Sequence, residues 1–221
     1  MSYWFYLSYE STINENFLTV FYQTLILGVS ASILITFLAF IFTYNIRVHK
    51  SKLADYLIQI SKLGYSIPGA VIAVGILSFF VIVSKTFNIL LIGSIAAVIF
   101  GYVVRFMAVS INNYESGFSK IPQTYDDACK TMSISSFQTF YKVIFPLIKN
   151  SIFASLIIVF IEVIKELPLT MILRPFNYDT LAVLSHELVG QAQIYESSVP
   201  AMFIVMLGII SVLLLAKKMK T

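Results

Sequence analysis

The sequence predicts an all-α, polytopic membrane protein with about five transmembrane helices. Hydrophobic residues make up 58% of the chain and charged residues only 12%, whereas a soluble domain is about 25% charged. Mean hydropathy is +0.87. The apolar residues gather in runs long enough to cross a bilayer, which takes roughly 20 residues per helix. A single transmembrane domain over residues 1–221 is therefore expected.

The apolar runs and the residues that interrupt them set the bounds of the expected spans. The first run contains small residues, Gly28 and Ala31 among them, where another helix can approach closely. In the second run, Pro68 and Gly69 break or kink the helix before it finishes crossing. The expected spans are 17–46, 55–83, 88–111, 148–167 and 198–216, with a polar loop at 112–147 and an outer re-entrant or interfacial segment at 168–197.

The distribution of Lys and Arg indicates the orientation, because cytoplasmic flanks retain positive charge. Residues 1–46 contain neither Lys nor Arg, whereas Arg47, Lys50 and Lys52 directly follow the first span. The amino terminus is therefore expected outside, and the carboxyl terminus, with its lysines, in the cytoplasm. Five crossings also place the loop 112–147 in the cytoplasm.

The remaining composition argues against several classes of function. The net charge of +4 comes without a basic, aromatic-rich cluster on a polar segment, so no nucleic acid partner is expected. Cys129 is the only cysteine, and no His/Cys spacing typical of a metal site occurs. No catalytic set and no glycine-rich phosphate loop is present. The chain is expected to bind no cofactor or metal and to catalyse no reaction itself.

The polar loop predicts two short helices with a break between them. Pro122 is typical of a helix start, and Asp126 and Asp127 follow in the first turn, where the helix dipole favours acids. Residues 133–136, rich in serine, interrupt the run. The second helix carries an apolar stripe at helical spacing: Phe137, Phe140, Tyr141 and Ile144. Such a helix lies either on lipid headgroups or its own bundle, or in a groove of a partner protein.

The stretch DDACKTMSISSFQTFYKVIFPLI resembles the cytoplasmic EAA loop of ABC-importer permeases. That loop reads Glu-Ala-Ala, three residues, Gly, and nine further residues to a hydrophobic-x-Leu-Pro ending. This sequence departs from the pattern at its first and third positions, at the Gly, which is Ser here, and at Phe145. The candidate ATPase-coupling residues are Asp127, Ala128, Cys129, Ser133, Phe137, Phe140 and Pro146.

The resemblance implies the partners of the chain. In that family the loop inserts into a cleft of the ATP-binding subunit and passes its closure to the transmembrane helices. We therefore expect a dimer of ATP-binding subunits, which binds ATP and Mg²⁺, and a second permease half, identical or different. We also expect a substrate-binding protein on the outer side of the bacterial inner membrane. The lipid bilayer itself surrounds the spans.

A second resemblance bears on the substrate. The segment Glu162–Val183, EVIKELPLTMILRPFNYDTLAV, is similar to the second half of bacterial iron(III) permeases, and so is Leu63–Leu77. It implies import of ferric iron; permeases for thiamine, phosphate or polyamine share the loop and remain alternatives. The usual iron permease is a fused chain of two halves, and this chain carries one. The sequence is consistent with a naturally separate subunit, with a half that forms a homodimer and with a fragment of a fused permease.

Charged residues near the outer end of the fourth expected span carry the candidate gate. Glu162, Lys165 and Glu166 stand at i, i+3 and i+4, so they are expected on one helix face. They line a translocation path or, alternatively, form a Glu-Lys pair that tethers the helix end. Neither acid is assigned as an iron ligand. The candidate path residues are Pro68, Gly69, Glu162, Lys165, Glu166 and Arg174.

Two rival classes make different demands on the sequence. An ion-driven secondary transporter is expected to show internal repeats and charges at mid-membrane, and the expected spans carry no charge at their centres. Arg105 is expected near the inner end of the third span, where its side chain can reach cytoplasmic phosphates. It is therefore not counted as a charge at the centre of a span. A membrane anchor for a soluble complex explains the loop but not the broken second helix.

Overall fold

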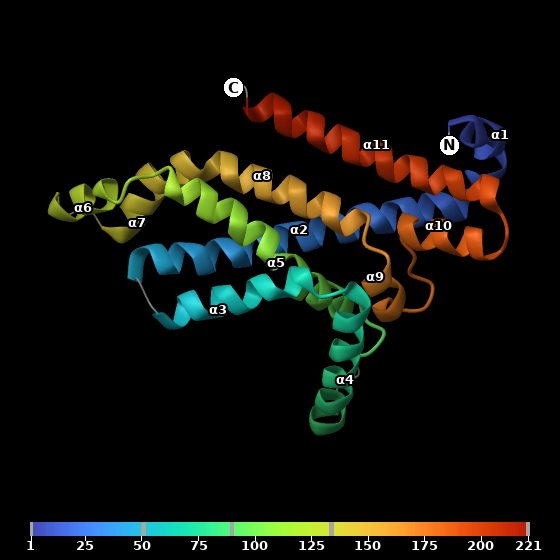
Figure 1. Cartoon of the computed structure of the whole chain (residues 1–221), viewed down its shortest axis with the longest axis horizontal. Coiled ribbons are helices and arrows are strands. Elements are labelled where there is room, and N and C mark those ends of the chain that lie inside the picture. Colours follow the sequence, from blue (N-terminus) through green and yellow to red (C-terminus); the bar gives the residue numbers. More distant parts are fainter. Residues whose placement is uncertain (1, 50–51, 89–90, 133–134, 220–221) are drawn as a thin grey trace.

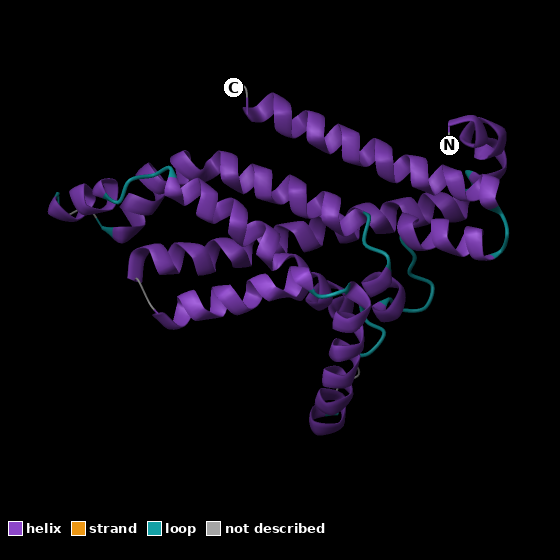
Figure 2. Ribbon diagram, viewed as in Figure 1, coloured by secondary structure: helices purple, strands orange, loops and turns teal. Residues whose placement is uncertain are grey.

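The computed structural model describes residues 2–49, 52–88, 91–132 and 135–219, and over these ranges the chain forms helices and loops without a strand (Figure 2). Five helices are long and apolar enough to cross a membrane. They are α2 (Glu15–His49), α4 (Gly69–Phe87), α5 (Ile95–Ser119), α8 (Phe145–Ile164) and α11 (Ile194–Met219). The predicted all-α polytopic fold is confirmed.

Shorter helices connect these five (Figure 1). They are α1 (Ser2–Thr12), α3 (Lys52–Leu63), α6 (Thr124–Thr131), α7 (Ser136–Thr139), α9 (Pro168–Leu173) and α10 (Leu181–Gly190). A π-helical turn, Phe140–Ile144, leads from α7 directly into α8. Helix α5 continues to Ser119 and so takes in the first part of the expected loop.

Helices α2, α5 and α8 pack together as the centre of the molecule. The small residues of α2 permit this approach: a Cβ added at Gly28 would lie 2.8 Å from the Phe160 ring, and Ala31 is fully buried. Polar side chains also link the helices, since Ser110 hydrogen-bonds Ser155. The centre is therefore held by close contact and interhelical hydrogen bonds, the usual means inside a membrane.

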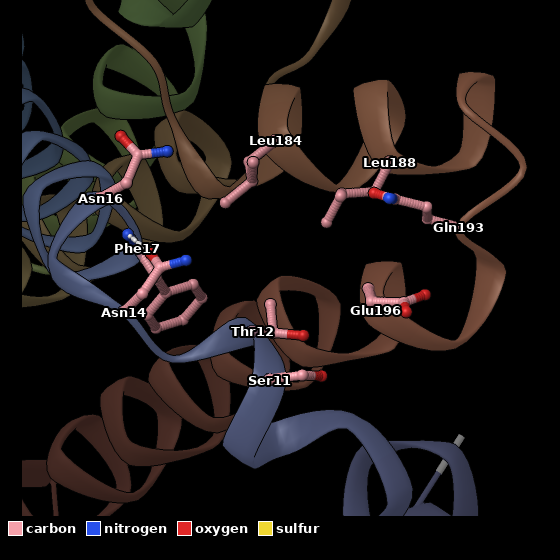
Figure 3. Close-up of a pocket in the computed structure, with 9 residues that line it drawn as sticks. All are labelled: Ser11, Thr12, Asn14, Asn16, Phe17, Leu184, Leu188, Gln193 and Glu196. Carbon is pink, nitrogen blue, oxygen red and sulfur yellow. Dashed lines mark hydrogen bonds between the residues drawn. The ribbon is translucent and has the colours of Figure 1, made fainter.

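The two ends of the bundle differ (Figure 1). At one, which we call the α1 end, α1 and α10 pack against the start of α11, and the α1–α2 turn faces α10 across a pocket (Figure 3). At the other, the α6 end, α6 and α7 project beyond the ends of α2 and α5. The chain thus has one end where α1 and α10 lie and one end formed by the central loop.

The expected span 55–83 corresponds to two helices in the structure. α3 ends at Leu63, a single 3-10 turn follows, and Pro68 with ψ 137° redirects the chain before α4 begins at Gly69. A Cβ at Gly64 would collide with the Val104 carbonyl, so the turn is pressed against α5. Proline fixes φ and lacks an N–H, which ends one helix and starts the next. As a result α4 points away from the bundle (Figure 1).

Candidate functional site

The central loop forms the projecting part of the α6 end. Cys129 of α6 is buried at 7% exposure, and Pro146 lies exposed in the first turn of α8. Asp127 and Ala128 belong to α6 and Phe137 to α7, but their side chains fall outside the described residues, as does Ser133 altogether. Of the two short helices expected in the loop, α6 is separate, whereas α7 is only Ser136–Thr139 and continues through the π-helical turn into α8.

The π-helical turn divides the expected apolar stripe. Phe140 packs on Phe40 and Tyr44 of α2, with ring centroids 5.7 and 5.3 Å away, and Ile144 is fully buried. Tyr141 is instead 64% exposed and stacks on Phe145. The wider π turn changes the angle between successive side chains, so Tyr141 does not share a face with Phe140 and Ile144. The segment therefore rests on its own bundle through Phe140 and Ile144.

Arg47 connects the end of α2 to the start of the central loop. Its guanidinium donates to the carbonyls of Phe118, Ile121 and Pro122 at 3.2, 3.1 and 3.4 Å and lies 5.3 Å from the centroid of the Phe118 ring. These carbonyls lie at and just beyond the C-terminal end of α5, where a cation is favourable. From the sequence alone, Arg47 indicates only the orientation of the first span, because its hydrogen-bond partners lie 71 to 75 residues further along the chain.

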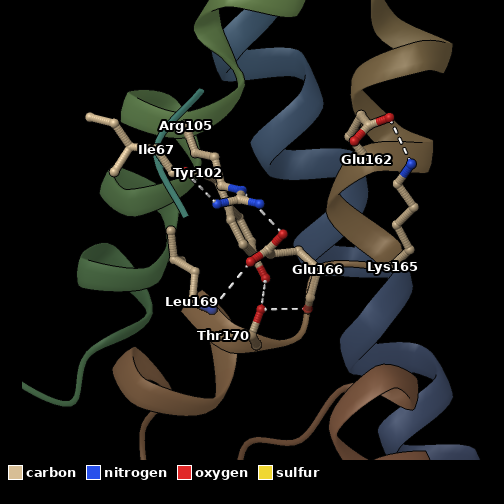
Figure 4. Close-up of polar contacts among 8 residues, drawn as sticks. All are labelled: Ile67, Tyr102, Arg105, Glu162, Lys165, Glu166, Leu169 and Thr170. Atoms are coloured by element: carbon tan, nitrogen blue, oxygen red, sulfur yellow. Dashed lines mark hydrogen bonds and ion pairs between the residues drawn. The ribbon is translucent and has the colours of Figure 1, made fainter. Parts of the chain in front are cut away.

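A network that we call the polar joint links α4, α5, α9 and the corner between α8 and α9 (Figure 4). At its centre Arg105 Nε lies 3.2 Å from Glu166 Oε2, with the side chains 19% and 7% exposed, and Arg105 Nη1 donates to the Ile67 carbonyl at 3.0 Å. The expectation that Arg105 reaches cytoplasmic phosphates is wrong, because its guanidinium turns into the protein. The third span does carry a charge near its centre. The polar joint comprises Ile67, Gly69, Tyr102, Arg105, Glu166, Leu169 and Thr170.

The rest of the polar joint fixes the corner between α8 and α9. Glu166 Oε1 accepts the Leu169 N–H at 3.2 Å, and its backbone carbonyl accepts from Thr170 Oγ1 at 2.8 Å. The Thr170 hydroxyl also hydrogen-bonds the Tyr102 hydroxyl at 2.6 Å. A Cβ at Gly69 would lie 2.5 Å from Glu166 Oε1 and 2.7 Å from Arg105 Nη1. Glycine is therefore needed where α4 begins.

The three charged residues near the end of α8 do not share a face. Because α8 ends at Ile164, Glu166 turns toward Arg105 while Glu162 and Lys165 pair with each other at 2.8 Å on another side (Figure 4). Lys165 is 53% exposed. Of the six candidate path residues, Gly69 and Glu166 meet in the polar joint, Pro68 adjoins it, and the Glu162–Lys165 pair stands apart.

Arg174 belongs to a separate set of contacts near α10. Its guanidinium pairs with Asp179 and with Glu187, the latter at 2.5 Å. On the same segment the Tyr178 hydroxyl donates to the Gln23 carbonyl at 3.2 Å, and burial raises the pKa of this phenol. These contacts hold residues 174–187 against α2. Over the part of the chain that the structure describes, no group of three or more His, Cys, Asp or Glu could hold a metal ion.

Comparisons with known proteins agree with this architecture. The family model described as "Binding-protein-dependent transport system inner membrane component" matches residues 33–219. A search of curated proteins found no match. A chain from an inward-facing structure of the MetNI methionine ABC transporter superposes with a TM-score of 0.69 and 14% identity, over 94% of this chain and 98% of that chain.

These findings confirm a type I ABC importer permease and a multi-pass membrane protein. Such a permease is not an enzyme, because ATP hydrolysis lies in a separate subunit. The fold implies an ATP-binding subunit and a substrate-binding protein. With the family model covering most of its length, the chain belongs to the inner-membrane components of binding-protein-dependent transport systems.

Proposed function

We propose that this permease imports ferric iron, received from a substrate-binding protein, across the bacterial inner membrane. The observation that carries the proposal is the polar joint. The two segments that resemble iron(III) permeases, Leu63–Leu77 and Glu162–Val183, meet there: the first supplies Ile67 and Gly69, the second Glu166 and its neighbours in α9. The resemblance thus concentrates on residues that are in contact. A permease for thiamine, phosphate or polyamine remains the alternative.

The α6 end is the proposed contact with a dimer of ATP-binding subunits, which bind ATP and Mg²⁺. Helices α6 and α7 project there. Cys129 belongs to α6, and Phe140 and Pro146 follow α7 in the π-helical turn and the first turn of α8. The π-helical turn that follows α7 contacts α2 through the rings of Phe140, Phe40 and Tyr44, so a displacement of α7 would be transmitted to α2. The same contacts would carry the effect of nucleotide-driven closure into the bundle. In this arrangement the α6 end and the carboxyl terminus are cytoplasmic, and α1 lies outside.

The proposed path runs beside α4 and the polar joint, between this chain and a second permease half. An apolar groove of about 340 Å³ lies between α4 and α5, lined by residues such as Val71, Phe79 and Phe100. Val71 and Phe79 are 59% and 52% exposed. A second permease half packed on this face would cover them. Pro68, Gly69, Glu162, Lys165, Glu166 and Arg174 stay candidate gate residues.

The test is reconstitution of the tagged chain with its co-purified ATPase in vesicles. ATPase activity is measured with the binding protein loaded with ferric iron, and again with the empty protein. Stimulation by the ferric form alone, with uptake of iron, is expected. Stimulation only by a binding protein carrying another solute would refute iron, and no stimulation by any would refute coupled import.

The coupling residues have their own test in the same vesicles. Asp127→Lys and Ser133→Trp are expected to leave the protein inserted and to separate ATP hydrolysis from uptake. Unchanged uptake per ATP hydrolysed in both variants would refute the assignment of this loop. Because insertion is scored separately, a folding failure is recognised as such.

A further inference from the structure

The pocket at the α1 end belongs neither to the polar joint nor to the α6 end. It lies between the α1–α2 turn and the α10–α11 turn and has a volume of about 280 Å³ (Figure 3). Phe17, Leu184 and Leu188 supply its apolar lining. The other lining residues, which we call the polar lining, are Ser11, Thr12, Asn14, Asn16, Gln193 and Glu196. This volume suits a headgroup-sized ligand and not a large solute.

The polar lining offers hydrogen-bond acceptors and carries one negative charge. Glu196 is the only charged residue among the nine that line the pocket. The Thr12 hydroxyl oxygen is buried and has no hydrogen-bond partner among the described residues. Asn14 Oδ1 accepts the Phe17 N–H at 2.9 Å. An ammonium group has three donors and no acceptor, so it matches the charge of Glu196 and the unpartnered Thr12 oxygen in this lining.

The position of the pocket brings it to the level of a membrane surface. Helix α1, which ends at Thr12, exposes Tyr3, Trp4 and Tyr6 at 71%, 40% and 73%. Exposed Tyr and Trp gather at the boundary between headgroups and water. We propose that the pocket binds a primary ammonium group, either the ethanolamine headgroup of a lipid or a small free amine. This site goes beyond the proposed import function and does not depend on the imported solute.

The experiment compares two lipids that carry the same charge. The permease with its co-purified ATPase is washed in detergent containing ethanolamine-headgroup or choline-headgroup phospholipid, and retained lipid is counted by native mass spectrometry. Choline has no N–H donor, so it cannot donate to Glu196 or Thr12. Charge-assisted hydrogen bonds predict about tenfold higher retention of the ethanolamine lipid. Equal retention of the two lipids, with no binding of free ethanolamine, would overturn the proposal.

Variants separate the pocket from general lipid binding. Glu196→Gln and Thr12→Val are both expected to abolish most of the preference. Thr12→Val removes a hydroxyl without a partner, so it is expected to leave the unliganded melting temperature unchanged. Glu10→Gln is the matched control: Glu10 lies at the same end but outside the pocket, and its exposed carboxylate accepts from the Tyr9 hydroxyl. A preference that survives in Glu196→Gln, or disappears equally in Glu10→Gln, would overturn the assignment.

Free ethanolamine identifies the source of the ammonium. If millimolar ethanolamine displaces the retained lipid or binds the lipid-free protein, and Glu196→Gln prevents it, the pocket takes small amines. If it has no effect while the lipid preference holds, the ligand is the lipid headgroup. Both outcomes support the ammonium site.

Discussion

Removing the carboxylate of Glu166 is expected to destabilise the protein strongly. At 3.2 Å from Arg105 Nε, opposite unit charges attract by about 5 kcal/mol at an effective dielectric constant of about 20. Desolvation offsets part of that attraction, but deleting one partner leaves the other charge buried and uncompensated, which costs about 3–5 kcal/mol. Glu166→Ala also removes the acceptor of the Leu169 N–H. The expected loss in unfolding free energy is about 4 kcal/mol, or roughly 10 °C in melting temperature.

The assay is thermal unfolding in nanodiscs, followed by circular dichroism. Glu162→Ala is the matched control: this acid also lies near the end of α8, but its partner Lys165 is 53% exposed, so the change is expected to cost less than about 1 kcal/mol. The double variant Arg105→Met/Glu166→Met is expected to recover much of the loss, since no unpaired charge remains. Equal shifts for Glu162→Ala and Glu166→Ala, or no recovery in the double variant, would refute the reasoning.

Three further predictions follow from the same contacts. Gly69→Ala is expected to lower the free energy of unfolding by about 1–3 kcal/mol, because its Cβ would lie 2.5 Å from the Glu166 carboxylate. Gly75→Ala, with nothing within 4 Å of the added Cβ, is expected to raise the free energy of unfolding by about 0.4–1 kcal/mol. The melting temperatures of both variants check this prediction, and equal shifts would contradict it. Arg47→Gln is expected to leave insertion intact and to lower uptake per ATP hydrolysed, measured in vesicles; an unchanged ratio would show that the bonds to the loop carbonyls do not serve coupling. Phe140→Ala is expected to lower the free energy of unfolding by about 2–3 kcal/mol, because removing a partly buried ring creates a cavity. Tyr141→Ala is expected to leave the free energy of unfolding almost unchanged. Identical melting temperatures of the two variants would refute the division of the stripe.

Much of the fold could be read before the structure because it depends on local properties. Whether a segment enters the bilayer depends on the hydropathy of roughly 20 neighbouring residues, and the described part of the chain holds five helices of this kind. The break at Pro68 was also predictable, since proline acts on its own backbone. The exact bounds of the helices were less predictable, because α3 is separate from α4 and α5 continues to Ser119.

The candidate sites could be predicted only in part. The loop and its two short helices follow from capping residues and spacing, whereas the π-helical turn that sends Phe140 inward and Tyr141 outward has no such local signal. The sequence marks Glu166 as a charge near a helix end but does not identify its partner, Arg105. The place of Arg105 within its own span does not indicate which segment packs against it.

The sequence by itself determined that this chain enters the membrane, which stretches are apolar enough to cross it and which loop is polar, because transfer of a segment into lipid depends on that segment alone. Only the tertiary structure decided that Arg105 meets Glu166 and that Arg47 meets the carbonyls beyond α5. These partners lie far apart in the chain. Their meeting depends on how the helices cross and on the rotation of each about its axis, which no local pattern specifies.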